Sequence, residues 1–96
     1  MATIDIRRNH SLDNQTVRQK AEELAQEMET KLHLKWGWEG ERIRFHAESG
    51  TAKGTSGFVT VSPKDVRVEI DLPFLLRALK GSISSKVNAK LDKLLG

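Results

Sequence analysis

The sequence contains neither cysteine nor tyrosine, and only two of its 96 residues are prolines. Without cysteine, the chain can form no disulfide framework and no thiolate site for zinc or redox chemistry. No segment approaches the roughly 20 consecutive apolar residues that a membrane-spanning helix requires. The opening stretch MATIDIRRNH carries charges where a secretory signal needs an apolar run, so we expect a cytoplasmic protein that is neither exported nor transmembrane.

The composition is that of an ordinary folded domain. Hydrophobic residues make up 38% of the chain and charged residues 30%, which argues against a disordered protein. A chain of this length can build only one hydrophobic core, because a smaller piece would bury too little surface to fold. We therefore expect a single domain over residues 1–96.

Positive charge is concentrated near the C-terminus. The net charge of the chain is +3, yet residues 73–96 contain five lysines and arginines against one aspartate, a local net charge of +4. Such an asymmetry favours an acidic protein, an anionic lipid surface or nucleic acid as a partner, without choosing among the three.

The first third of the chain predicts a strand followed by a long helix. Residues 2–8 alternate between apolar and polar, as a half-buried strand does. Apolar residues then recur every three or four positions, which predicts an amphipathic helix over about residues 14–33, with Asp13 as its N-cap.

Four further strands are predicted between residues 34 and 72. A hairpin that turns at Gly40 joins the first two, and the segment 50–57, which contains three glycines, leads to the next. Phe58 is out of phase with the valines that follow it, so either a bulge at Gly57 re-aims it or it faces outward. The strict alternation over residues 66–72 predicts the last strand.

A second amphipathic helix is expected to begin at Pro73 and to continue almost to the C-terminus. Every strand is apolar on one face and charged on the other, which is typical of an antiparallel sheet covered on one side. The predicted class is therefore α+β, in the order β-α-β-β-β-β-α. Two arrangements fit: a curved, helix-grip-like sheet with one face covered by the two helices, and a flat two-layer sandwich.

No catalytic, metal-binding or cofactor-binding constellation is recognisable in the sequence. His10, His33 and His46 lack the spacing of metal ligands. In the glycine-rich segment 50–57, Lys53 precedes the last glycines, whereas the lysine of a phosphate-binding loop follows them and opens a helix. We expect a protein that is not an enzyme and that uses no cofactor and no metal.

Three residues near the start of the first helix form a candidate anion-binding corner. Arg7, Arg8 and His10 lie just ahead of the predicted helix N-terminus, where backbone N–H groups and the helix dipole favour an anion. Packing of His10 within a turn is the simpler interpretation.

The aromatic residues suggest a second candidate site. Trp36 and Trp38 share one strand face, and Phe45 lies in the facing strand of the hairpin. Large aromatic side chains of a small domain usually belong to its core. The alternative is an apolar pocket between sheet and C-terminal helix, walled by these three rings and by Leu79 and Ile83.

A third candidate site is a basic edge of the C-terminal helix. Lys86, Lys90 and Lys93 follow one another at steps of four and three, beside the apolar stripe of that helix. Such an edge is usually a solvated face, but it can also bind an anionic surface or an acidic partner.

Three segments carry a family resemblance: IDIRRNHSL at the entrance of a helix, the hairpin KWGWEGERIRF, and the closing DLPFLLRALKGSISSKVNAKLDKLL. Over essentially the whole chain, the sequence is similar to small bacterial proteins named polyhydroxyalkanoic acid system proteins. That family has no established catalytic residues, so none are transferred to this chain.

The resemblance implies a protein that works near polyester storage granules. We expect a non-enzymatic accessory protein that binds a granule protein or the granule surface. The alternative is a module that binds an acyl or hydroxyacyl molecule in a cavity between the sheet and the C-terminal helix. A homodimer could form through exposed strand edges, whereas nucleic-acid binding is not expected.

Overall fold

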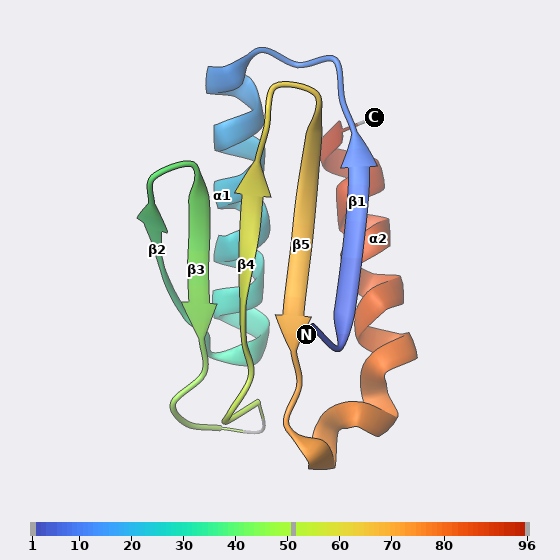
Figure 1. Cartoon of the computed structure of the whole chain (residues 1–96). Helices are drawn as coiled ribbons and strands as arrows, with labels where there is room; N and C mark the ends of the chain where they lie inside the picture. Colours follow the sequence, from blue (N-terminus) through green and yellow to red (C-terminus); the bar gives the residue numbers. More distant parts are fainter. Residues whose placement is uncertain (1, 51, 96) are drawn as a thin grey trace.

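Five strands, two α-helices and one short 3-10 helix make up the chain, in a computed structural model that describes residues 2–50 and 52–95 (Figure 1). In chain order they are β1 (Ile4–Asn9), α1 (Asn14–Leu32), β2 (Lys35–Glu39), β3 (Arg42–His46), β4 (Ser56–Val61), β5 (Asp65–Asp71), η1 (Phe74–Leu79) and α2 (Lys80–Leu95). The predicted order of strands and helices is therefore confirmed, with η1 as an addition.

The five strands form one open antiparallel sheet in the order β1-β5-β4-β3-β2. Strands β2 to β5 follow one another as a meander, and β1 closes the far side by pairing with β5. Both helices lie on the same face of the sheet, α1 against β2, β3 and β4, and α2 along β1 (Figure 1). The α+β class with one covered face is confirmed, and within it the two helices lie side by side and contact each other.

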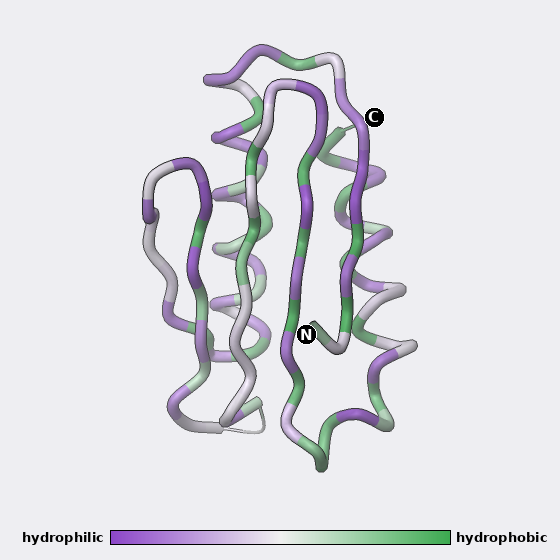
Figure 2. Tube along the Cα trace, in the orientation of Figure 1, coloured by the Kyte–Doolittle hydropathy of each residue, from purple (hydrophilic) through white to green (hydrophobic). Residues whose placement is uncertain are grey.

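The strict alternation of the strands explains why only one face needs a cover. Successive side chains of a strand point to opposite faces, so the register stacks apolar residues in rows across the sheet. One such row pairs Ile6 with Val68, Val68 with Val59, and Val59 with Ile43. Figure 2 shows the alternation as green and purple segments along β5 and β3. The face opposite the helices is charged and remains in solvent.

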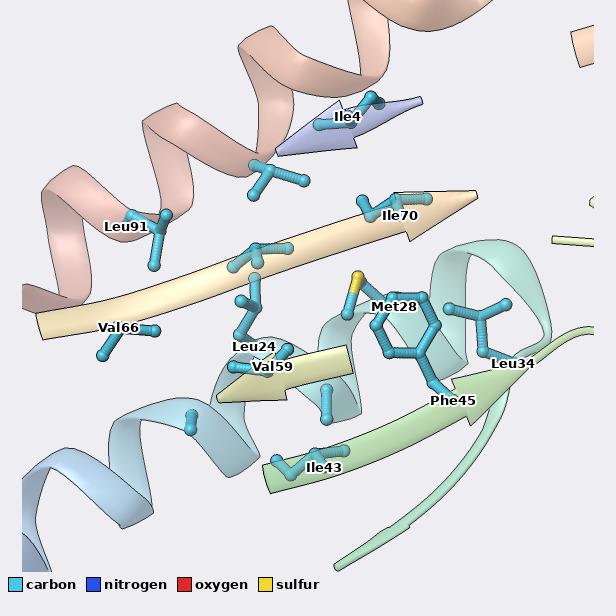
Figure 3. Close-up of a cluster of buried hydrophobic side chains, with 14 of the residues drawn as sticks. Ile4, Leu24, Met28, Leu34, Ile43, Phe45, Val59, Val66, Ile70 and Leu91 are labelled. Atoms are coloured by element: carbon cyan, nitrogen blue, oxygen red, sulfur yellow. The ribbon is translucent and has the colours of Figure 1, made fainter. Parts of the chain in front are cut away.

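The core lies between this apolar face and the two helices. From α1, Val17, Leu24 and Met28 are buried at helical spacing, and α2 contributes Val87 and Leu91. Figure 3 shows Met28 of α1 directed at Phe45 and Ile70 of the sheet. Fully burying a side chain of this size stabilises the fold by about 1.5 to 3 kcal/mol, so these contacts hold the helices on the sheet.

Both ends of α1 are capped. The side chain of Asp13 accepts a hydrogen bond from the backbone N–H of Thr16 at 2.7 Å, as predicted for the N-cap. This bond to the backbone of Thr16 lowers the pKa of Asp13 below its ordinary value. His33 ends the helix in the left-handed conformation, with φ of 56°. It serves as the C-cap of α1.

The C-terminal segment differs from the single helix predicted from Pro73 onward. Pro73 caps the 3-10 helix η1, and the α-helical geometry begins only at Lys80. A 3-10 helix has about three residues per turn, so Leu76 and Leu79 lie on one side of it and extend the apolar side of α2. Figure 1 shows η1 beyond the end of the sheet, at an angle to α2.

Phe58 faces outward, which settles the alternative left open by the sequence. It pairs with Arg44 and Glu69 on the solvent face, where the Arg42 guanidinium lies 4.1 Å from the centre of its ring. Its neighbour Gly57 is the one that faces the core, between Phe45 and Ile70. A Cβ at Gly57 would lie 2.1 Å from the Glu69 carbonyl oxygen and 2.6 Å from the Phe45 ring.

We predict that Gly57→Ala destabilises the protein by about 3 kcal/mol, the upper end of what overpacking usually costs. The added methyl group collides with backbone that cannot move without breaking the β4–β5 pairing. Urea unfolding followed by circular dichroism measures the change. Gly37→Ala is the matched control, because nothing lies within 4 Å of a Cβ at that strand position. Equal stability of the two variants would contradict this packing.

Candidate functional site

An apolar groove of about 370 Å³ opens between α1 and α2 at the end of the sheet where η1 lies. We call it the interhelix groove. Its lining comes from α1, from the sheet and the loops at its end, and from η1 and α2: Leu24, Glu27, Met28, Lys31, Leu32, Leu34, Phe45, Ala52, Thr55, Ile70, Leu72, Leu76, Leu79, Ser82, Ile83, Lys86, Val87 and Lys90.

Three elements of the fold build the walls and the floor of the groove. Met28 of α1 forms one wall, Ile83 of α2 forms the other, and Phe45 and Ile70 form the floor. The floor side chains meet Met28 in the close view of the core (Figure 3). Leu79, which is 50% exposed, carries the apolar surface outward along η1. The groove is therefore a continuation of the hydrophobic core to the surface.

Charged side chains surround the mouth of the groove. Lys31, Lys86 and Lys90, the cationic rim, contribute three positive charges, and Glu27 contributes one negative charge. The Glu27 carboxylate lies 2.9 Å from the Lys31 ammonium and 3.0 Å from that of Lys90. Among the described residues, no acidic group lies within ion-pair distance of Lys86. The mouth therefore has a net charge of +2.

The two lysines hold Glu27 in its charged form. The hydrogen bond from Lys31 and then that from Lys90 lower the pKa of Glu27 below its ordinary value of 4.5. Both contacts favour the carboxylate over the neutral acid. At neutral pH, Glu27 links α1 to α2 across the groove and cancels part of the lysine charge.

One polar side chain that lines the groove is buried and has no partner. Thr55 is 3% exposed, and its Oγ1 forms no hydrogen bond with the described residues. Its backbone is fixed, because its N–H donates to the Ala52 carbonyl at 2.9 Å and its carbonyl accepts from the Ala47 N–H at 2.8 Å. An unpaired buried hydroxyl costs roughly 1 to 3 kcal/mol of stability, so the Thr55 hydroxyl is an unsatisfied hydrogen-bonding group in a residue of the groove lining.

Beyond the groove, η1 exposes large apolar side chains. Phe74 is 79% exposed and Leu75 is 87% exposed. With Leu79 they form what we call the apolar end of the molecule, visible in Figure 2 as the green part of the chain below the sheet. Arg77 and Lys80 are exposed beside it. Hydrophobic side chains this exposed and this close together usually mark an interaction site.

The structure divides the predicted aromatic pocket. Phe45, Leu79 and Ile83 line the interhelix groove, whereas Trp36 and Trp38 lie outside it. The two indole N–H groups donate to carboxylates of α1, Trp36 to Glu29 and Trp38 to Glu22, each at 2.8 Å. These contacts attach the edge strand β2 to α1, so the tryptophans are structural residues here.

The predicted anion corner is not assembled. Arg7 points to the open face of the sheet, because residues of a strand alternate, and Arg8 instead reaches α2, where it contacts Asn88 and Asp92. Both ring nitrogens of His10 are used: Nδ1 accepts from the Leu12 N–H at 3.1 Å, and Nε2 lies 2.8 Å from the Ser62 carbonyl. The three side chains therefore do not converge on one site.

The predicted basic edge is also divided. Lys86 and Lys90 belong to the rim of the groove, and Lys93 lies farther along α2 in solvent. Lys90 is engaged with Glu27, so only Lys86 and Lys93 of the three keep an exposed ammonium without a described acidic neighbour. The edge is thus a groove rim at one end and a solvated flank at the other.

The described parts of the chain contain neither a metal-binding cluster nor a membrane-spanning helix. Within residues 2–50 and 52–95, no three metal-ligating side chains gather closely enough to hold an ion. No helix in these ranges is both long and apolar enough to cross a membrane. The glycine-rich segment 50–57, whose Thr51 is outside the described residues, joins β3 to β4 as an ordinary connection.

The sequence did not single out three residues that matter in the structure. Thr55 lies in the glycine-rich segment that was predicted as a connection between strands, and no pattern predicts that its hydroxyl lacks a partner. Phe74 and Leu75 were counted as the start of the second helix. The available signal was that neither residue belongs to the apolar stripe of that helix, which begins with Leu76 and Leu79.

The fold and the groove together define a class of protein: a small α+β domain, with an open sheet and an apolar groove that has a cationic rim. Comparison with known families then identifies it further. Residues 4–95 match the family model PHA_gran_rgn, described as "Putative polyhydroxyalkanoic acid system protein", and the chain belongs to this family. No curated protein matches the chain in the corresponding search.

If the tryptophans attach β2 to α1, removing one of their acceptors weakens the fold. We expect Glu22→Ala to lower the free energy of unfolding by about 1.5 kcal/mol, since the partly buried Trp38 N–H loses a charged acceptor. Glu23→Ala is the matched control on the same helix, and its exposed carboxylate should matter by no more than about 0.5 kcal/mol. Urea unfolding compares the two, and equal losses would contradict a structural role for the Trp38 contact.

The pKa of Glu27 reports the link between the helices. Titration followed by NMR should give a value below 4.5, and the pair of substitutions Lys31→Met and Lys90→Met should raise it. Because the pKa is lowered in the folded state, the stability from this contact is fully present above pH 4.5 and is lost as pH falls through the lowered pKa. Lys20→Met, on the same helix, should leave the Glu27 titration unchanged. A Glu27 pKa that does not change when both rim lysines are replaced would contradict this link between α1 and α2.

Proposed function

We propose that this protein is a non-enzymatic accessory protein of the polyhydroxyalkanoate storage system that binds the surface of the storage granule. The description of the family to which the chain belongs supports a role in the polyhydroxyalkanoate system. The single observation that carries the binding proposal is the exposure of Phe74 and Leu75, at 79% and 87%, on an element that ends the molecule.

An apolar end of this kind suits an apolar surface. Transfer of one Phe or Leu side chain out of water contributes about 1.5 to 3 kcal/mol. Such side chains are costly to leave in solvent unless they have a partner, and η1 has no cover among the described residues. A storage polyester is itself apolar, so insertion of Phe74 and Leu75 into its boundary would recover this free energy.

The basic residues beside the apolar end fit the same orientation. Arg77 lies within η1, Lys80 directly follows it, and Lys93 adds positive charge farther along the exposed flank of α2. Cations beside an inserted apolar segment are attracted to anionic groups at an interface, and this contribution weakens with added salt. The charge thus supports attachment, while the apolar side chains supply most of the affinity.

A granule-bound protein is the other partner that the apolar end could take. Granules stripped of protein distinguish the two, because direct surface binding survives stripping. Pairing of two copies through the outermost strands β1 and β2 stays a prediction. Nucleic acid is disfavoured on the open face, where Arg42 covers the Phe58 ring and Arg67 is paired with Asp5.

A second candidate function, the binding of an acyl or hydroxyacyl molecule, is favoured by the interhelix groove. Its volume of about 370 Å³ lies within the range of small-molecule pockets, about 300 to 1,000 Å³. The groove and the apolar end share Leu79, but Phe74 and Leu75 belong to the apolar end alone. The two functions can therefore be tested separately.

Co-sedimentation with stripped granules tests the proposed function. The double variant Phe74→Ser and Leu75→Ser should weaken binding at least about tenfold, which corresponds to about 1.4 kcal/mol. Both side chains are exposed, so the fold should be unaffected. Lys93→Glu should weaken binding by less, about twofold to fivefold, and the difference should disappear at high salt.

Phe58→Ser is the matched control, since it also removes an aromatic ring but from the open face of the sheet. It should sediment with granules as the unmodified protein does. Undiminished binding of the double variant would refute the role of the apolar end. Binding only to granules that keep their proteins would transfer the proposal to a granule protein.

A further inference from the structure

We propose that the interhelix groove binds an anionic hydroxyalkanoate: its carboxylate lies at the cationic rim beside Lys86, its chain fills the groove, and an oxygen along the chain meets Thr55. This inference deepens the second candidate function. It does not depend on granule binding, because it uses neither Phe74 nor Leu75, the two side chains proposed to bind the granule.

The walls of the groove require an apolar chain. Met28, Phe45, Ile70 and Ile83 present only hydrocarbon, sulfur and ring atoms to the space between the helices. A ligand that buries a methylene group against such walls gains about 0.8 kcal/mol for each one. A small polar metabolite would gain little here, so the chain of the ligand must be largely aliphatic.

The rim requires a negative charge at the open end of that chain. Lys31 and Lys90 already share the Glu27 carboxylate, at 2.9 and 3.0 Å. Lys86 is exposed and lacks a described acidic neighbour, so it is the ammonium that can take a new carboxylate. The net charge of +2 around the mouth disfavours a cationic ligand and favours an anionic one.

Thr55 requires an oxygen or other polar atom within the chain. Thr55 lines the groove and its backbone is fixed, while its Oγ1 is buried against protein atoms and has no described hydrogen-bond partner. Rotation of the side chain about χ1 is the movement that would turn this hydroxyl toward a ligand. A simple fatty acid would leave this hydroxyl unpaired. A hydroxyl or ester carbonyl along the chain would pair with it, and a hydroxyalkanoate carries such an oxygen together with an apolar chain and a carboxylate.

Other occupants fit these three features less well. A second copy of this chain would have to place an apolar segment in the groove, and the exposed apolar segment η1 itself contains Arg77 and is followed by Lys80. Those cations would approach the cationic rim, which disfavours the pairing.

Isothermal titration calorimetry of the full chain with four probes tests the proposal. The probes are 3-hydroxydecanoate, decanoate, decanol and the ester-linked dimer of 3-hydroxybutyrate. We expect 3-hydroxydecanoate to bind about fivefold more tightly than decanoate, the effect of one satisfied hydrogen bond. Decanol, which lacks the charge, should bind more weakly than decanoate. The ester dimer distinguishes a free hydroxy acid from the end of a polyester chain as the source of the ligand. It should bind more tightly than 3-hydroxydecanoate only if the groove is suited to the end of a polyester chain.

Three variants assign the effects to residues. Thr55→Val should abolish the preference for 3-hydroxydecanoate over decanoate, and it should raise Tm by a few degrees because it removes an unpaired buried hydroxyl. Lys86→Glu should weaken both acids about fivefold or more, without affecting decanol. Lys93→Glu is the matched control on the same helix, and it should leave all four affinities unchanged.

Several results would overturn the inference. Absence of binding by every probe would do so, as would equal binding of decanol and decanoate, or a hydroxyl preference that persists in Thr55→Val. A dimer that dissociates when a probe binds would assign the groove to a second copy instead. Thr55→Val should still sediment with granules, so failure of granule binding and failure of ligand binding are distinguished.

Discussion

The constraint on which the rest of the structure depends is that one sheet face must be buried by only two helices. The register places every apolar strand residue except Phe58 on that face, and the opposite face is charged. At the floor of the groove, Gly57 lets the ring of Phe45 pack closely against the backbone of β4, because Gly57 has no side chain to occupy that space. Helix α1 covers β2, β3 and β4, and α2 lies along β1. The space that remains between the two helices at the η1 end is the interhelix groove.

The charged residues follow from the same arrangement. Those nearest the helices are used to attach elements to one another: Glu22 and Glu29 attach β2 to α1, Glu27 joins α1 to α2, and Arg8 joins β1 to α2. The polar residues near the helices that do not attach one element to another are therefore informative. Lys86 at the rim and Thr55 in the lining lack described partners, and both belong to the groove. These two polar groups therefore lie beside the unfilled apolar space.

Much of the fold was predictable because its elements have strong local signals. The stripe of α1, its cap at Asp13 and the alternation of β5 each depend on residues close together in the sequence. The candidate site was predictable only in part. Phe45, Leu79 and Ile83 do share a groove, but Trp36 and Trp38, which were grouped with them because they share the strand face opposite Phe45, lie outside it. Which carboxylate an indole N–H reaches depends on the neighbouring helix, and a strand pattern contains no information about it.

The sequence by itself determined the class of the fold, the order of its elements and the faces of its strands, because periodicity follows from local backbone geometry. It also determined the excess of positive charge in the last quarter of the chain. Only the tertiary structure decided that the side chains of Arg7, Arg8 and His10 do not converge on one site. It also decided that η1 exposes Phe74 and Leu75 to solvent and that the Thr55 hydroxyl has no described hydrogen-bond partner. These outcomes depend on contacts between residues far apart in the chain, whose distances are set by how the helices pack on the sheet.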